Sequence, residues 1–352
     1  MIPNPDLCES ANPLHNSNTP SLHLLPMPST TWTPMEIPPD INRHGIYVGT
    51  SGYYFDDWIG RFNPPKSFRA RTPEESDWND RLCFYQRYFS FVEINTTFYR
   101  EPALTHFVDI ERRSKESMKY AVKASRDISH TREWNTARGR ELMQQHVTAV
   151  SPLIETGRFF SFLIQLEDHV YRSQKRLDYL LSTAEAAVRS RVGVHIEFRH
   201  ISWHTQFVLQ SLKDAGVGIC NTDIPAVPHA FPLKAYATTD KGYIRYSGKN
   251  LANWYQETSA PEGPSSAGTD SRSPSHSLPA RQSERDRLAS RNARYDYQYT
   301  EQEVDHHVSD QLKLSKKTSA SAIAYNNHYQ TQAVKNAVEN MKKLQAVLEA
   351  GV

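Results

Sequence analysis

Short strand-like runs alternate with helix-like segments along most of this chain, and this alternation limits the fold more than any other feature. Each run places Val, Ile or Phe at alternate or consecutive positions, as half-buried and fully buried strands require. Eight runs are predicted, over residues 46–52, 91–99, 120–128, 159–166, 192–199, 217–223, 242–247 and 320–326. Strands that alternate with helices favour an α/β fold, and eight of them within roughly 300 residues predict a single (β/α)₈ TIM-like barrel.

Helix signals fill the intervals between these runs. Gly216 is placed as a C-cap glycine after a helix over residues 207–215. Thr300 and Glu303 have the spacing of a capping box at the start of a helix that reaches about residue 314. A doubly wound open sheet is the alternative fold, and it is weakened because no Gly-x-Gly-x-x-Gly sequence follows the first strand.

Two segments depart from this pattern and define the domain organisation. Residues 1–45 hold nine of the 21 prolines, and residues 256–292 are rich in Ser, Pro and Arg. Such segments bury too little apolar surface to fold, which agrees with the low mean hydropathy of −0.66. We therefore predict a disordered extension over 1–45 and one barrel over 46–350, interrupted by a flexible low-complexity insertion at 256–292.

The composition argues against several classes of protein. The formal net charge is +2, so no strong field favours nucleic acid or a membrane surface. Three scattered cysteines, Cys8, Cys83 and Cys220, form neither a disulfide framework nor a zinc-site spacing. No apolar stretch approaches the roughly 18 residues that cross a bilayer, and the N-terminus lacks a secretory or transit pattern. These features predict a soluble intracellular protein, cytoplasmic with the nucleus as the alternative, and without a nucleic-acid partner.

Charged side chains interrupt two of the predicted strands. Period-two geometry puts Glu93 and Asn95 on one face of their strand, and His195, Glu197 and Arg199 on one face of theirs. A buried carboxylate without a partner is costly, so these groups must be paired, solvated in a cleft or bound to a ligand. They are the strongest indication of a site.

Several motifs occur together along the chain. They are Val48-Gly49-Thr50-Ser51-Gly52-Tyr53 with Trp58, the run 91–99 followed by Pro102, Glu197-Phe198-Arg199-His200 with Trp203, and Tyr325-Asn326-Asn327. Because the same motifs occur in the same order in a known family, the chain is similar to the YecE-like family, also called domain of unknown function 72, over residues 46–255 and 293–347. The resemblance implies a TIM-barrel fold and no established activity.

Ligand chemistry in such barrels lies at the C-terminal ends of the strands, which defines a set of candidate residues. We expect Glu93 to pair with Lys123, and Glu197 with Arg245 or Arg199. Cys220 is expected in the core, and the His306–His307 pair on a solvated helix face. The candidates at the strand ends are Ser51, Glu93, Asn95, Tyr99, Lys123, Gln165, Glu197, Arg199, His200, Asp223, Arg245, Tyr325, Asn326 and Asn327.

The first functional hypothesis is an enzyme that acts on a small anionic or phosphate-containing substrate. Arg199, Arg245 and Lys123 would hold the anion, since arginine suits bidentate recognition of carboxylate or phosphate. Glu93 or Glu197 would act as general acid or base, and His200 would carry a proton near neutral pH.

Two alternatives stay open. One is a non-catalytic binding or adaptor protein whose barrel interior is a structural ion-pair network and whose partners are unknown. The other is a metal-dependent isomerase- or endonuclease-like enzyme, with Glu93, His195, Glu197 and Asp223 as ligands. Neighbouring Arg and Lys residues would repel a cation, so the hypothesis we favour includes no metal and no cofactor.

Overall fold

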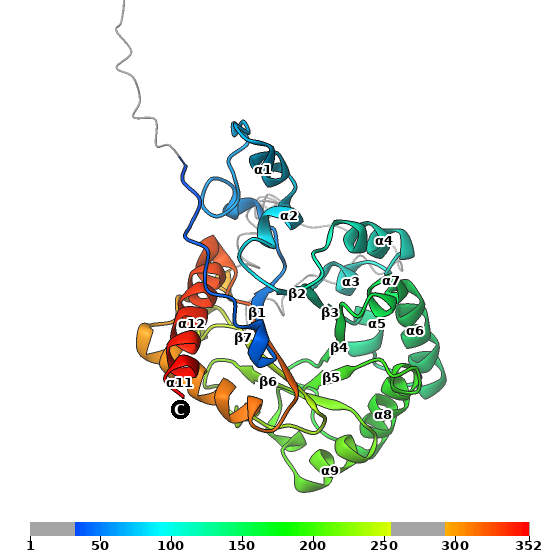
Figure 1. Cartoon of the computed structure of the whole chain (residues 1–352). Helices are drawn as coiled ribbons and strands as arrows, with labels where there is room; N and C mark the ends of the chain where they lie inside the picture. Colours follow the sequence, from blue (N-terminus) through cyan, green and yellow to red (C-terminus); the bar gives the residue numbers. More distant parts are fainter. Residues whose placement is uncertain (1–31, 255–292, 352) are drawn as a thin grey trace, which may run out of the picture. The chain divides into compact units, whose positions relative to one another are not determined.

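Eight parallel strands, consecutive along the chain, close into a barrel in this computed structural model, which describes residues 32–254 and 293–351 (Figure 1). The TIM-barrel prediction is confirmed. The strands are β1 (Ile46–Ser51), β2 (Phe91–Ile94), β3 (Lys119–Lys123), β4 (Phe159–Gln165), β5 (Val194–Glu197), β6 (Gly218–Asp223), β7 (Lys241–Tyr246) and β8 (Ala320–Tyr325).

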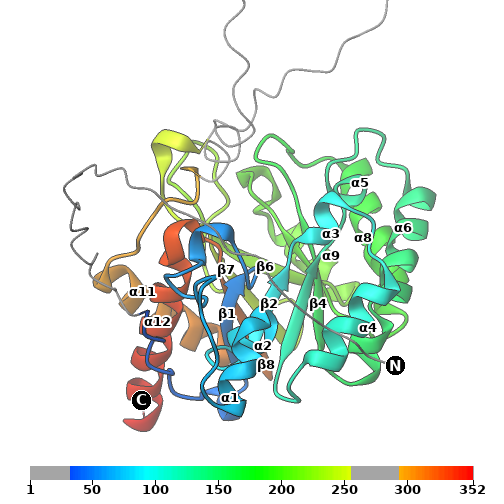
Figure 2. The ribbon, with the colours of Figure 1, turned by 90° about the horizontal axis from the view of Figure 1, so that it is seen from above.

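Helices surround the strands on the outside of the barrel (Figures 1 and 2). The long helices are α4 (Leu104–Arg113), α6 (Thr136–Ala149), α8 (Gln174–Val188), α9 (Gln206–Asp214), α11 (Glu301–Ser315) and α12 (Gln332–Glu349). The short helices are α1 (Pro73–Ser76), α2 (Arg81–Tyr85), α3 (Thr96–Tyr99), α5 (Arg126–Ser129) and α7 (Ser151–Glu155), with 3₁₀ turns at η1 (Asn42–His44), η2 (Asp56–Trp58), η3 (Asp77–Asn79), η4 (Ile201–Trp203), η5 (Leu251–Asn253) and η7 (Tyr329–Thr331). Among the described residues, no helix is long and apolar enough to cross a membrane.

The barrel interior has an apolar layer below a charged layer. Phe91, Leu163, Cys220 and Tyr243 belong to one buried cluster, which confirms Cys220 as a core residue. Two residues further along their strands, the same inward faces carry polar side chains, because side chains on one face of a strand recur at every second residue. Register aligns Ser51 with Glu93, Gln165 with Glu197, and Arg245 with Ala324. The apolar layer therefore closes the barrel beneath the charged one.

Two predicted strands, 91–99 and 120–128, end earlier than expected. β2 stops at Ile94, and Asn95 adopts a helical backbone (φ −105°, ψ −11°) that starts α3. β3 stops at Lys123, and α5 follows. The Thr97 hydroxyl donates to the Lys123 carbonyl at 2.6 Å, and this hydrogen bond holds α3 against the end of β3. Every residue of these two short strands still pairs with at least one neighbouring strand.

Part of the predicted N-terminal extension lies against the barrel. Ile41 is 1% exposed, the Tyr88 hydroxyl donates to the Met35 carbonyl at 3.2 Å, and Ser90 hydrogen-bonds Asn42. The boundary predicted at residue 45 is therefore too late, because an isolated apolar residue such as Ile41 finds a partner surface that composition alone does not reveal. Residues 1–31 and the insertion at 256–292 lie outside the described residues.

The capping box of α11 provides a stability prediction. The Thr300 hydroxyl accepts from the Glu303 amide while the Glu303 carboxylate accepts from the Thr300 amide, as predicted. Thr300→Ala is expected to lower the free energy of unfolding by about 1 kcal/mol, since a helix N-terminal amide loses its partner. Urea denaturation would measure the change. Thr148→Ala, at an exposed position in the last turn of α6, is the control and should not destabilise the protein.

Candidate functional site

Arg245 is the centre of a buried ion-pair network at the C-terminal mouth of the barrel. Its Nε and Nη2 donate to the two carboxylate oxygens of Glu93 at 2.7 and 2.9 Å. Its Nη1 donates to Glu197 and, at 3.2 Å, to Gln165. Glu93 also accepts from the Ser51 hydroxyl at 2.8 Å. Glu93 and Glu197 are 0% exposed and Arg245 is 1% exposed, so the network is closed to solvent.

A second arginine extends this network toward the loops above the mouth. Arg199 Nε donates to Glu197 at 2.9 Å, and its Nη1 lies 3.4 Å from Asp168. The Trp254 indole donates to the other oxygen of Asp168 at 2.8 Å, and the Arg199 guanidinium lies 5.3 Å from the Trp254 ring centre. Both partners predicted for Glu197, Arg245 and Arg199, are thus confirmed.

The charges of the network fix its protonation. Burial alone would raise the pKa of Glu197, but Arg245 and Arg199 outweigh it and lower that pKa to about 2. Burial raises the pKa of the Tyr243 phenol well above its usual value, and the negative Glu93 adds to the effect. Tyr243 therefore stays protonated and donates to Glu93 at 2.6 Å. Glu197 therefore keeps its negative charge near neutral pH while these pairs are intact.

Lys123 stands apart from the network. The predicted Glu93–Lys123 pair is wrong, because the bidentate Arg245 occupies the Glu93 carboxylate. The half-buried Lys123 ammonium instead lies 4.1 Å from the centre of the Phe98 ring. Desolvation by burial, followed by the positive charge of Arg245, lowers the pKa of Lys123 to about 7. Lys123 is therefore the cation of the mouth that most readily gives up its proton.

A basic hollow of about 290 Å³ follows the ends of β3 and β4. Arg126, Arg132 and Arg176 line it together with His130, while Glu167 supplies a carboxylate 3.7 Å from His130. The His130 ring packs edge-on against the same Phe98 ring that lies under Lys123, at 4.9 Å between centres. Arginine guanidinium groups in a concave site suit carboxylate or phosphate groups.

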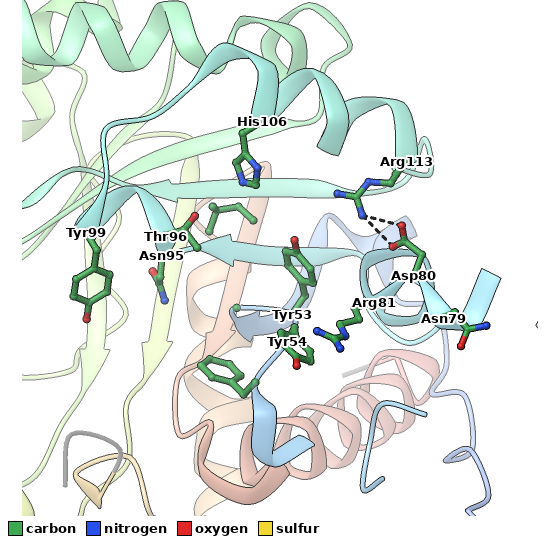
Figure 3. A pocket seen from close by; sticks show the side chains of 13 residues that line it. Tyr53, Tyr54, Asn79, Asp80, Arg81, Asn95, Thr96, Tyr99, His106 and Arg113 are labelled. Atoms are coloured by element: carbon green, nitrogen blue, oxygen red, sulfur yellow. Dashed lines mark hydrogen bonds and ion pairs between the residues drawn. The ribbon is translucent and has the colours of Figure 1, made fainter. Parts of the chain in front are cut away.

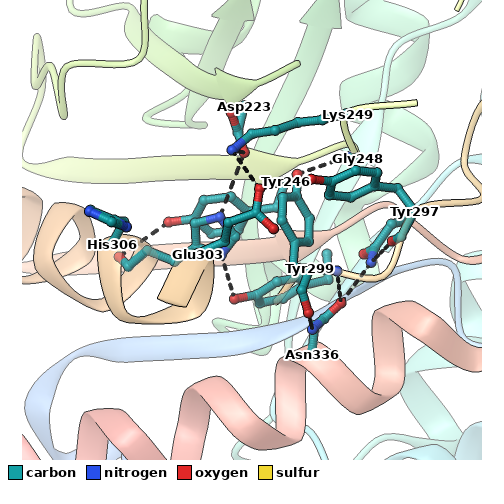
Figure 4. Close-up of polar contacts among 12 residues, drawn as sticks. Asp223, Tyr246, Gly248, Lys249, Tyr297, Tyr299, Glu303, His306 and Asn336 are labelled. Atoms are coloured by element: carbon teal, nitrogen blue, oxygen red, sulfur yellow. Dashed lines mark hydrogen bonds and ion pairs between the residues drawn. The ribbon is translucent and has the colours of Figure 1, made fainter. Parts of the chain in front are cut away.

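Three predicted ligand residues, Asp223, Tyr325 and Asn327, lie behind the strand ends instead of facing the mouth, whereas Asn326 follows inward-facing Ala324 by two positions and keeps its side of the strand. Asp223 is 3.4 Å from Lys249 (Figure 4). The Tyr325 hydroxyl contacts His307 of α11 at 3.1 Å. Asn326 donates to Ser247 at 3.3 Å, and Asn327 donates to Tyr297 and Asn336 at 2.8 and 2.9 Å. Asp223 and Tyr325 each follow an inward-facing residue, so the period of two turns them outward.

The predicted histidines have structural partners. His200 caps η4, accepting from the Ser202 amide at 3.1 Å, and within the described residues its ring contacts no member of the Arg245 network. His307 is 3% exposed and stacks on Tyr246 at 3.7 Å, so the solvated face expected for the His306–His307 pair holds for His306 only. A helix face cannot be assigned from an isolated His-His pair.

The predicted metal ligands do not converge. His195 lies at the base of its strand, hydrogen-bonded to Ser161 at 2.6 Å and to the Lys241 carbonyl at 3.0 Å. Glu93 and Glu197 are bound by arginine, and Asp223 lies behind the strands. Across residues 32–254 and 293–351, no three His, Cys, Asp or Glu side chains are grouped to hold a metal ion.

Asn95 and Tyr99 line a different, larger hollow beside the mouth, of about 630 Å³ (Figure 3). It lies between the segments that follow β1 and β2. Tyr53 and Tyr54 form another part of its wall, and the Arg113–Asp80 ion pair borders it. The two residues were expected at the barrel mouth, but the helical turn after Ile94 carries them into this neighbouring hollow.

Several residues of the mouth were not predicted. Tyr243 precedes Arg245 by two positions, and the same period-two rule that placed Arg245 could have found it. Asp168, Trp254 and Phe98 lie in loops or short turns after strands, where no periodicity indicates which side chains point inward.

Comparisons with known proteins identify the family. A family model described as "Protein of unknown function DUF72" matches residues 47–350. A DUF72 family protein from Thermotoga maritima is 26% identical, and the likeness covers 86% of this chain and 99% of that one with a TM-score of 0.64. A DUF72 family protein from Enterococcus faecalis shares the fold with a TM-score of 0.64. It is 21% identical, and the likeness covers 85% of this chain and 95% of that one. No protein of curated function matches. Because the family model covers most of the sequence, the chain belongs to the DUF72 family of proteins of unknown function.

Proposed function

We propose that this protein is an enzyme that acts on a small anionic substrate at the C-terminal mouth of its barrel, with Lys123 as the group that accepts and returns a proton. The isolation of Lys123 carries the proposal. Arg199 and Arg245 each bind carboxylates of the network. Among the described residues, no carboxylate lies within 4 Å of the Lys123 ammonium, which rests on Phe98.

The electrostatics of Lys123 support a role as a base. A general base must be unprotonated before it can accept a proton, and it works best when its pKa is near the working pH. Burial lowers the pKa of Lys123 to about 7, so a large fraction of the side chain is the neutral amine at neutral pH. An ordinary lysine, with a pKa near 10.4, would be almost fully protonated.

The basic hollow supports an anionic substrate. Within the described part of the chain, Arg126 and Arg132 have no carboxylate partner, and both line the hollow with His130. Phe98 joins this hollow to Lys123, because its ring contacts both His130 and the ammonium group. A carboxylate or phosphate held by these arginines would bring the rest of the molecule toward Lys123.

The proposed step is a reversible proton transfer without net oxidation. The Lys123 amine accepts a proton from a carbon next to a substrate carbonyl, and the electron pair of the broken C–H bond becomes an enolate. The new ammonium charge and nearby Arg199 stabilise the enolate oxygen. The ammonium group exchanges its hydrogens with solvent and then returns one of them to the carbon.

Solvent exchange tests this step. A panel of 2-oxo acids and ketose phosphates would be incubated with the protein in D₂O, and loss of C–H signals followed by proton NMR. The wild type is expected to exchange at least one compound, and Lys123→Met to slow that exchange about 100-fold. Lys213→Met, an exposed lysine of α9, is the matched control and should exchange normally. Normal exchange by Lys123→Met, or no exchange of any compound by the wild type, would contradict the proposal.

A non-catalytic binding protein is the second candidate, supported by the complete pairing of Glu93, Glu197 and Arg245 inside the barrel. In that case inorganic phosphate should bind, Arg126→Ala should weaken its binding, and none of the compounds should exchange. Both candidates predict that phosphate binds to the arginines of the basic hollow, so the exchange measurement in D₂O separates the two functions.

A further inference from the structure

The hollow of about 630 Å³ beside the mouth is separate from the proposed reaction site. Its volume falls within the roughly 300–1,000 Å³ typical of small-molecule sites. Helix α3 divides it from the mouth, because Phe98 contacts Lys123 whereas the adjoining Tyr99 lines the hollow. The two rings meet edge-to-face at 4.9 Å between centres.

Aromatic side chains from two separate segments line this hollow. Tyr53, Tyr54 and Phe55 come from the segment after β1, and Tyr99 comes from α3 (Figure 3). Tyr99 is 77% exposed, a high value for a large aromatic side chain. Rings that wall a cavity on two sides offer flat faces on which a planar aromatic molecule can stack.

One polar atom in this hollow lacks a partner. The side-chain amide oxygen of Asn95, Oδ1, is buried and accepts no hydrogen bond among the described residues. A buried acceptor without a donor costs free energy, which a ligand N–H group would recover on binding. The amide oxygen thus adds a directional contact to the aromatic walls.

The charges around the hollow argue against a cationic ligand. Asp80 is held by Arg113, with both carboxylate oxygens within 3.0 Å of one guanidinium nitrogen. Arg81 lies 3.5 Å from the Tyr54 ring centre and forms no ion pair within the described residues. Among the described lining residues, no carboxylate is therefore free to bind a cation, while Oδ1 of Asn95 lacks a donor and the Tyr99 ring is exposed.

We infer that this hollow binds a planar, uncharged aromatic heterocycle of about purine size, whose amino group donates to Oδ1 of Asn95. The ring would stack against Tyr99 at the lip and against Tyr53 of the segment after β1. The site would work independently of proton transfer by Lys123.

Adenosine is the probe for this site, with binding followed by isothermal titration. The wild type should bind adenosine saturably and Tyr99→Ala about tenfold more weakly. Phe207→Ala removes a comparably exposed ring from α9 and should bind like the wild type. Because Tyr99 and Phe207 are both exposed, neither change should unfold the protein. Absence of saturable binding by the wild type, or equal affinity in the wild type and Tyr99→Ala, would overturn the inference.

A second measurement tests the contact of the amino group with Asn95. N⁶,N⁶-dimethyladenosine lacks the amino N–H donors, so the wild type should bind it about tenfold more weakly than adenosine. Asn95→Leu should bind the two nucleosides equally, because its side chain has no acceptor. An undiminished preference for adenosine in Asn95→Leu would show that the amino group donates elsewhere and would refute the assignment of Asn95.

Discussion

Arg245→Met is expected to lower the free energy of unfolding by about 3–5 kcal/mol, because it leaves buried carboxylates without their main counter-charge. Glu93 would keep only the hydroxyl groups of Ser51 and Tyr243, and Glu197 would keep only Arg199. All of these groups are at least 95% buried, so water cannot replace the missing guanidinium without opening the barrel. Urea denaturation at pH 7.5 would measure the loss.

Two further variants show whether the loss comes from unpaired charge. Adding Glu93→Gln to Arg245→Met removes the carboxylate charge that the first change leaves without a cationic partner, and should recover much of the stability, because Glu197 still has Arg199. Arg189→Met breaks an exposed pair with Glu185 on α8 and should cost less than about 1 kcal/mol. A loss below about 1 kcal/mol for Arg245→Met would show that solvent reaches the network.

The sequence predicted where these charged residues lie along the barrel axis better than it predicted which residues pair with one another. Period-two alternation correctly put Glu197 and Arg199 on one inward face. It also indicated the strand ends, where parallel strands of a barrel place polar residues. It could not show that Arg245, from β7, reaches across the interior to Glu93 of β2. The pairing of Glu93 with Lys123 was expected because their strands are adjacent. That expectation was wrong because the long Arg245 side chain reaches Glu93 from the other side of the barrel.

Two candidates predicted to face the mouth, Tyr325 and Asp223, point outward for a simpler reason. Tyr325 and Asp223 lie at strand ends as predicted, but Ala324 and Thr222 occupy the inward positions just before them. Applying the alternation to each strand would have assigned both residues to the helix side. No such rule reaches Trp254 or Arg126, because loop residues have no repeating geometry and only the folded chain shows where their side chains lie.

His328→Phe is expected to raise the free energy of unfolding relative to the wild type more at pH 5 than at pH 8. The difference between the two pH values should be about 2 kcal/mol. Burial lowers the pKa of His328 to about 3, against 6.5 in an unfolded chain. Below pH 6.5 the unfolded state binds a proton that the folded state does not, so this histidine destabilises the fold increasingly as the pH falls toward 3. Phenylalanine removes the titration and keeps the ring stacked on Phe55, 4.1 Å away.

Other buried histidines should add to this acid sensitivity. Burial lowers the pKa of His195 to about 4, so it too contributes about 2 kcal/mol of destabilisation at pH 5, and the wild type should lose stability steeply between pH 6.5 and 5. Urea denaturation at pH 8 and pH 5 would measure both effects. His306→Phe, at an exposed position of α11, is the control and should leave the difference between the two pH values unchanged. If His328→Phe behaves like this control, His328 accepts a proton in the folded protein, and the ring must then reach water or a partner through local opening.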